Sequence, residues 1–211
     1  MTFEFRFDFR SGGEQGWIAG FADYPPGQEE FFELEVGYRS LPAPLNTSEN
    51  GLFSSGNNHS DDLFMFWKRG ISLGPATSYQ VRFEVEFATN APQGCVGVGG
   101  APGEGVTIKA GSSVVEPESV VMGDALRMNI DIGNQTTGGA DAIALGDFAN
   151  SQLCGSGPPT YALKTLSSAT GQFELTTDGS GAAWIIVGTD SGFEATTAIY
   201  WTRIAAVFEP M

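Results

Sequence analysis

The chain has 211 residues, of which 41% are hydrophobic and 12% aromatic, and this size and composition suit one all-β domain over residues 1–211. Its formal net charge of −15 argues against binding to nucleic acid and against basic-patch binding to anionic membranes. No run of about 18 apolar residues is present, which predicts that no helix spans a membrane.

The first strand is predicted from the alternation in "FEFRFDF". Phe3, Phe5, Phe7 and Phe9 share one parity, and charged residues occupy the other. This period of two is typical of a half-buried strand. The same segment lacks the basic and apolar regions of a signal peptide, so we expect a cytoplasmic chain or a mature one whose leader has been removed.

The period recurs in "YQVRFEVEFA" (79–88) and indicates an antiparallel sheet with one solvated face. Three other runs are apolar at both parities and predict strands covered on both faces. They are "LFMFW" (63–67), "AAWIIV" (182–187) and "IYWTRIAAVF" (199–208).

Shorter strands are expected between turns such as "YPPG", "TNAPQG" and "GSGPP". Helical periodicity is scarce, and we expect one short helical turn within "PESVVMGDALRM" (117–128). Many short strands separated by glycine and proline predict a jelly-roll β-sandwich. The first and last strands are expected to lie side by side, as chain ends often do within one domain.

A polar loop, "SSGNNHSDD", precedes the apolar run at Leu63. Its amide and carboxylate oxygens could bind sugar hydroxyls or a hard cation such as calcium. Trp67 is a candidate stacking platform, with a core position as the alternative, and Arg69 is a candidate bidentate donor. A plain polar turn would have the same composition. The candidate ligand-binding residues are Asn57, Asn58, Asp61, Asp62, Trp67 and Arg69.

Two other motifs do not support a catalytic or phosphate-binding reading. His59 has no nucleophile elbow to act on, so we expect it to be a surface histidine. The stretch "CVGVGGAPGEG" has Pro102 where a dinucleotide fingerprint requires glycine, so a glycine-rich bend is expected. Such a bend could bring Cys95 to Cys154, which would form one disulfide or remain as two buried thiols.

A second acidic loop, "GTDSGFEATT", presents Asp190 and Glu194 as candidate metal ligands, with calcium as the possible ion. Paired carboxylates are also the machinery of glycoside hydrolysis. A glycoside or ester hydrolase that uses acidic loop residues is therefore an alternative function.

Five segments together carry a resemblance to known proteins. They are "GFADYPPGQEEFFEL", "SGNNHSDDLFMFWKR", "YQVRFEVEFATNAPQGCVGVGGAPGEGVTIKAG", "RMNIDIGNQTTGGADAIALGDFANS" and "WIIVGTDSGFEATTAIYWTRI". With these segments the chain resembles an uncharacterised family of bacterial exported or lipoprotein-like β-sandwich proteins, and its strand layout is loosely similar to galactose-binding-like jelly rolls, which include carbohydrate-binding modules. The resemblance implies a secreted, periplasmic or lipid-anchored protein, a sugar ligand and a structural calcium.

These observations favour a non-catalytic extracytoplasmic binding module whose ligand is a carbohydrate or glycoconjugate. The aromatic strands, the polar loops and the absence of a catalytic motif support this reading. A structural or interaction protein of the cell envelope is a further alternative.

Overall fold

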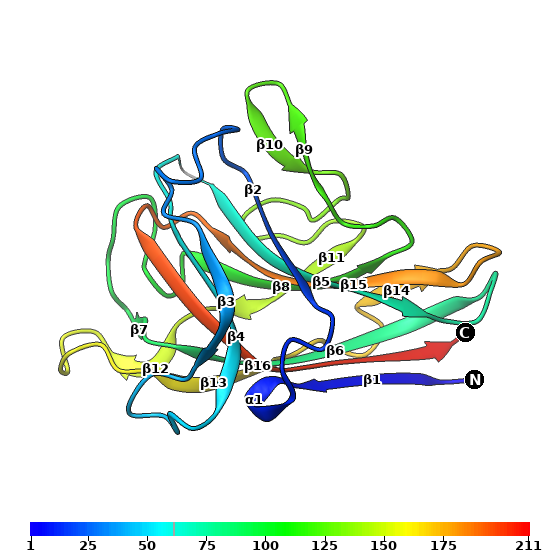
Figure 1. Ribbon diagram of the computed structural model, residues 1–211, viewed down its shortest axis with the longest axis horizontal. Helices are drawn as coiled ribbons and strands as arrows, with labels where there is room; N and C mark the ends of the chain where they lie inside the picture. The colour runs from blue at the N-terminus through cyan, green and yellow to red at the C-terminus, as the bar shows by residue number, and fades with distance from the viewer. Residues whose placement is uncertain (61) are drawn as a thin grey trace.

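The computed structural model describes residues 1–60 and 62–211, and almost all of its regular structure is β-strand (Figure 1). Two antiparallel sheets pack face to face, which confirms the predicted all-β jelly-roll sandwich. The first, sheet A, contains β1 (Phe3–Asp8), β3 (Glu35–Ser40), β4 (Asn50–Asn57), β6 (Ser78–Thr89), β13 (Ala162–Ser167), β14 (Phe173–Thr176) and β16 (Thr196–Pro210).

Sheet B contains five strands, in the order β11-β8-β15-β5-β2. They are β2 (Ile18–Ala22), β5 (Leu63–Ser72), β8 (Val106–Ser113), β11 (Ala142–Asp147) and β15 (Ala182–Ser191). Outside the two sheets are one helix and two small strand pairs. They are α1 (Phe9–Gly12), the pair of β9 (Ser119–Met122) with β10 (Ala125–Met128), and the pair of β7 (Pro92–Gln93) with β12 (Asn150–Leu153).

The expected first strand is present, but it ends one residue early. Exposure alternates along β1 as predicted, and Phe3 lies opposite Phe208 of β16, so the first and last strands are side by side. Phe9 is not part of the strand. Asp8 accepts a hydrogen bond from the backbone N–H of Arg10 and caps the short helix α1, from which Phe9 reaches the core.

The strand β5 is covered on both faces, as the sequence predicts. Leu63, Met65 and Trp67 face the core between the sheets, whereas Phe64 and Phe66 belong to a second apolar cluster on the outer face of sheet B. Met128, Ile130 and Ile132 cover that second cluster. They follow or end the β9–β10 pair, so this hairpin and the segment after it form a lid over sheet B.

That hairpin corrects the expected helical turn within 117–128. Met122 lies opposite Ala125, and Gly123 between them has φ +69°. A glycine at positive φ suits a two-residue hairpin turn, which overrides the weak helical pattern. Among the described residues, α1 is the only helix, and it is too short to cross a bilayer.

The run "IYWTRIAAVF" is apolar at both parities for a different reason from the one predicted. Its strand, β16, contains a register shift between Trp201 and Arg203. Before the shift the odd-numbered residues Ile199 and Trp201 face the core. After the shift the even-numbered residues face it: Ile204, Ala206 and Phe208. A β-bulge exchanges the two faces in this way. The other face of β16 is therefore partly open to solvent.

Candidate functional site

The outer face of sheet A carries a row of ring side chains across neighbouring strands. Tyr200 of β16 lies opposite Phe53 of β4, with ring centroids 4.8 Å apart. On its other side Tyr200 meets Tyr161 edge to face at 5.7 Å. Both tyrosines are partly exposed, whereas Phe53 is only 5% exposed. The row therefore presents two accessible rings with a third ring beneath.

Arg39 of β3 extends the row. Its guanidinium carbon lies 4.0 Å above the centre of the Phe53 ring, and Glu35 on the same strand holds the guanidinium at 2.9 Å. The ion pair and the ring place a flat donor group beside Tyr200. The row thus ends in a charged, solvent-exposed group.

The two tyrosine hydroxyls are donors at neutral pH. Burial raises the pKa of Tyr161, with a smaller contribution from Tyr200, and burial also raises the pKa of Tyr200 against the opposing charge of Arg39. Neither hydroxyl bonds to another residue within the described part of the chain. Both are free to hydrogen-bond to a ligand.

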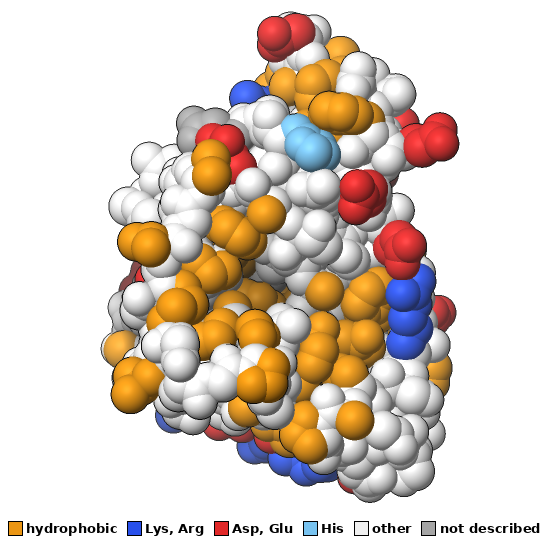
Figure 2. All heavy atoms as spheres, turned by 90° about the vertical axis from the view of Figure 1, so that its left-hand side faces the viewer, with side chains coloured by type: hydrophobic (Ala, Val, Ile, Leu, Met, Phe, Trp, Pro, Cys, Tyr) orange, Lys and Arg blue, Asp and Glu red, His pale blue; other side chains and the backbone are white. Residues whose placement is uncertain are grey.

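An apolar pocket of about 380 Å³ continues the same face. Ala198 precedes Tyr200 by two positions on β16 and lines the pocket, and Pro159 lines it close to Tyr161. The disulfide between Cys95 and Cys154 forms part of its wall. Figure 2 shows this side of the molecule hollowed and lined with hydrophobic side chains.

The sequence left open whether the two cysteines form a disulfide or remain as buried thiols. Cys95 and Cys154 are bonded rather than free, and the bond joins the loops after β7 and β12. It ties together the two loops that border the hollow.

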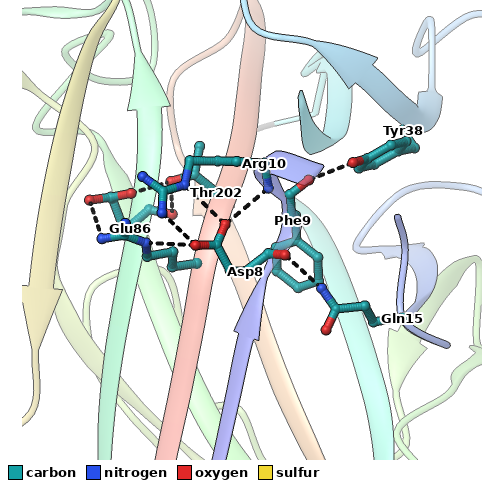
Figure 3. A network of polar contacts seen from close by, with 8 residues as sticks. Asp8, Phe9, Arg10, Gln15, Tyr38, Glu86 and Thr202 are labelled. Atoms are coloured by element: carbon teal, nitrogen blue, oxygen red, sulfur yellow. Dashed lines mark hydrogen bonds and ion pairs between the residues drawn. The ribbon is translucent and has the colours of Figure 1, made fainter. Parts of the chain in front are cut away.

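Another part of the outer face of sheet A carries a network of charged side chains (Figure 3). The carboxylate of Asp8 forms ion pairs with Arg10 and with Arg203, whose Nε lies 3.2 Å from it. Arg203 reaches Glu86 at 3.6 Å, and Thr202 donates to Glu86 at 2.8 Å. The two guanidiniums, Arg10 first, hold the pKa of Asp8 well below its usual range. Every member has a partner, so this network anchors α1 and β1 rather than offering a site.

A second, acidic pocket of about 220 Å³ lies on sheet B, under the lid. Lys109 of β8 and Asp190 of β15 form a buried ion pair at 2.7 Å. Lys109 also donates to the carbonyls of Ile132 and Asn134, at 2.9 and 2.6 Å. The ammonium group therefore pins the lid to the sheet.

Two further carboxylates face this ion pair. Arg127 holds Asp23 at 2.6 Å and reaches Asp62 at 3.6 Å. Burial, then the charge of Asp190, raises the pKa of Asp62 to about 8. One buried oxygen of Asp62 and one of Asp190 have no other partner in the described residues, so a proton on Asp62 would satisfy both.

The predicted polar loop does not converge on one site. Asn58 is 1% exposed and donates to the carbonyl of Ser191, so it clamps the loop. Asn57 donates to Glu33 at 3.3 Å. Asp62 lines the acidic pocket, and Asp61 lies outside the described residues. His59 packs on Phe31 at 4.3 Å, at the surface as expected.

The other two predicted ligand-binding residues, Trp67 and Arg69, lie away from the polar loop. Trp67 is 3% exposed, and its indole N–H donates to Ser54 at 2.7 Å, so the prediction of a stacking platform is wrong and the core alternative is correct. The odd positions of β5 face the other sheet, which buries the ring. Arg69 lies seven residues beyond Asp62 on β5 and lines a separate groove.

The predicted metal ligands have different neighbours. Asp190 is paired with Lys109, whereas the side chain of Glu194 lies beside Gly99 in the glycine-rich bend. The described residues contain no group of three or more His, Cys, Asp or Glu side chains that could hold a metal ion. Calcium binding at Asp190 and Glu194 stays a prediction.

The ring row was not predicted from the sequence. Tyr200 lies in a run that was expected to be covered on both faces, and the partners that place it beside Phe53 and Tyr161 are distant in sequence. The one local signal is the bulge-like sequence itself, in which "IYW" and "RIAAVF" alternate with opposite parity.

No family model matches the chain, and no curated protein matches it. Similar solved structures include a carbohydrate-binding module described for promiscuous specificity in the β-sandwich superfamily, with 12% identity and a TM-score of 0.40 over 97% of this chain. This chain spans 60% of the length of that one.

Two further similar structures have nearly the same length as this chain. One is a carbohydrate-binding module described for specific mannan recognition, with 10% identity, a TM-score of 0.45 and 98% of both chains covered. The other is the family 11 carbohydrate-binding module of Clostridium thermocellum with a β-1,3-1,4-mixed-linked tetrasaccharide, with 11% identity, a TM-score of 0.38, and 96% of this chain and 94% of that one covered.

Proposed function

We propose that the protein is a non-catalytic, extracytoplasmic carbohydrate-binding module that binds its ligand on the outer face of sheet A. The observation that carries the proposal is the pair of partly exposed rings, Tyr200 on β16 and Tyr161 just before β13, beside the guanidinium of Arg39.

The chemistry of this row suits a sugar. The faces of a pyranose ring are apolar and pack on aromatic side chains, while its hydroxyls need donors and acceptors at the edge. Tyr200 and Tyr161 supply ring surface and free hydroxyls, and Arg39 with Glu35 supplies a donor and an acceptor. The row runs across the strands, which suits a short stretch of an extended glycan.

The backing of the row supports binding. Phe53, Tyr200 and Arg39 lie on paired strands, and Tyr161 directly precedes β13. Tyr200 is held by neighbouring strands on both sides. A site on rigid elements loses little conformational freedom when a ligand arrives.

The proposal is tested by calorimetry against neutral β-linked polysaccharides: glucan, xylan, mannan and galactan. We expect binding to at least one of them, weakened tenfold or more by Tyr200→Ala and by Tyr161→Ala. Phe31→Ala is the matched control, because Phe31 is an aromatic residue with 58% exposure outside the row. Its affinity should stay within twofold of the parent protein. Binding that survives both tyrosine changes would overturn the proposal, as would no binding to any member of the panel.

One observation favours a second candidate, hydrolysis of glycosidic or ester bonds. A carboxyl whose pKa is raised to about 8 and which faces a pocket, as Asp62 does, is a suitable general acid. The neighbouring carboxylate of Asp190 is 2% exposed and occupied by Lys109, which makes it a poor nucleophile or base. Turnover that is lost in Asp62→Asn and kept in Tyr200→Ala would favour this candidate over binding alone.

A further inference from the structure

Arg69 occupies a position that its strand otherwise gives to apolar residues. On β5 the odd positions face the other sheet, and Trp67 and Ile71 on either side of Arg69 pack against the core between the sheets. Its partner across the ladder, Ile185, is fully buried in the same core. An arginine at this parity brings a permanent charge to the inner side of the sandwich.

Among the described residues, this arginine has no ion-pair or hydrogen-bond partner. Every other lysine and arginine forms an ion pair with a carboxylate, whereas Arg69 has neither an ion pair nor a hydrogen bond among residues 1–60 and 62–211. Its Nε is buried and unsatisfied. A chain with 25 acidic residues and 10 basic ones has many carboxylates to offer, so an unpaired guanidinium here is a departure that function explains better than packing does.

The guanidinium lies at a groove of about 410 Å³ on the open side of the sandwich. Phe5 and Phe7 of β1 supply aromatic walls. The backbone of Gly16, at φ +75°, lies so close that an added Cβ would come within 2.8 Å of Nη1 of Arg69. The backbone of this turn therefore closes one side of the guanidinium.

The groove lies between two strand edges without partners in the described part of the chain. β1 pairs only with β16, and β2 pairs with β5 no further than Lys68. The edge of β5 from Arg69 to Ser72 is thus open on that side. Free backbone groups there add donors and acceptors to the guanidinium and the rings.

We propose that this groove is a second binding site, for a small ligand in which one ring carries one carboxylate. The guanidinium of Arg69 would bind the carboxylate with two parallel hydrogen bonds, and the aromatic walls would hold the ring. A hexuronic acid and an aromatic acid share this chemistry. A polyanionic chain does not fit, because the net charge of −15 repels it beyond the one contact.

The proposal is independent of the glycan face, because the two sites share no residue. The test is a titration followed by NMR, with the Nε–H resonance of Arg69 and the backbone N–H resonances of Gly70 and Ala183 as reporters. The two backbone resonances also report on binding in variants at residue 69. The probes are D-galacturonate, D-galactose, benzoate and a tripeptide with a free carboxyl end, all at low ionic strength. We expect galacturonate or benzoate to shift these resonances with a dissociation constant at least tenfold below that of galactose.

Three variants separate binding from folding. Arg69→Leu should remove carboxylate binding and raise Tm, because it restores an apolar residue at a core-facing position. Arg69→Lys keeps the positive charge but loses the two parallel N–H donors of the guanidinium, and should weaken binding several-fold. Arg6→Leu is the matched control, since Arg6 lies on β1 with its side chain on the opposite, solvated side. Its affinity should stay within twofold of the parent protein.

The outcomes are decisive in both directions. Galacturonate binding above benzoate assigns the site to a sugar acid, and the reverse assigns it to an aromatic acid; both support the proposal. Equal affinity for galactose and galacturonate, binding that survives Arg69→Leu, preference for the peptide, or no shift with any probe would overturn it. Tyr200→Ala should leave these shifts unchanged, so failure of the glycan face and failure of this groove are distinguishable.

Discussion

The two sheets of the sandwich have outer faces of opposite kinds. On sheet B a lid of apolar residues covers Phe64 and Phe66, and a buried ammonium group, that of Lys109, ties the lid down. On sheet A no such cover is found among the described residues, and Tyr161 and Tyr200 are partly exposed to solvent. The covered face contributes stability, and the open face is available to a ligand.

The difference also shows in how each face uses charge. The ion pair on sheet B has side-chain exposures of 1% and 3%, whereas Arg82 and Glu209 on sheet A are both 44% exposed. A buried charge that loses its partner is costly, while an exposed pair contributes little. The same chemistry is therefore structural on one face and close to neutral on the other.

The largest predicted loss of stability comes from removing the buried ammonium group on sheet B. Lys109→Met leaves Asp190 as a buried, unpaired carboxylate and frees two lid carbonyls, so we expect a loss of about 3–5 kcal/mol in the free energy of unfolding. Arg82→Met, the matched change on sheet A, should cost less than about 1 kcal/mol. Urea unfolding monitored by tryptophan fluorescence measures both. Equal losses would show that the lid does not depend on the buried pair.

The next effect concerns the border of the open face. The disulfide between Cys95 and Cys154 closes a loop with a sequence separation of 59 residues, so replacing both by serine should cost about 2–4 kcal/mol. The parent protein in reductant should unfold at the same urea concentration as the double variant. A double variant as stable as the oxidised parent would mean that the loops hold the hollow without the bond.

A third prediction tests the lid through pH. The folded pKa of Asp62, about 8, is far above its unfolded value, so the folded state binds the proton more tightly. The stability that this proton contributes is complete below about pH 4 and is lost as pH rises through about 8. Asp62→Asn places a permanent donor beside Asp190 and should flatten this dependence.

The measurement for that prediction is Tm between pH 5 and 9. We expect Asp62→Asn to be more stable than the parent protein at pH 9, by on the order of 1–3 kcal/mol, and close to it at pH 5. Glu174→Gln is the control, because Glu174 is an exposed acidic residue of β14 that lies outside the acidic pocket. A parent protein with a flat Tm over this range would contradict the shared proton.

Much of the sandwich can be predicted from the sequence because its signals are local. The alternation in β1 and β6 and the double-sided burial of β5 follow from side-chain parity alone. The ring row could not be predicted, because it depends on which strands become neighbours. Tyr200 meets Phe53 only through the pairing of β16 with β4.

The acidic residues show the same limit. Asp62 is near the predicted site in sequence, but its partner Asp190 arrives through the β5–β15 ladder, and Lys109 arrives from β8. Asn58, at the centre of the predicted loop, was a structural clamp instead. Composition identifies polar loops, whereas convergence into a pocket is a property of strand order.

The smallest predicted loss of stability concerns Asp8, in the charged network on sheet A. Asp8 caps α1 and holds Arg10 and Arg203, yet it is 48% exposed, so we expect Asp8→Ala to cost only about 1 kcal/mol at pH 7. Asp8→Asn keeps the cap and loses the charge, and should retain about half of that stability. Because the pKa of Asp8 is lowered by its guanidinium partners, its contribution is present above about pH 4 and is lost as pH falls further. Chemical unfolding of both variants at pH 7 and pH 3 measures this, and a cost of 3 kcal/mol or more at pH 7 would mean that the open face, too, depends on its charges for folding.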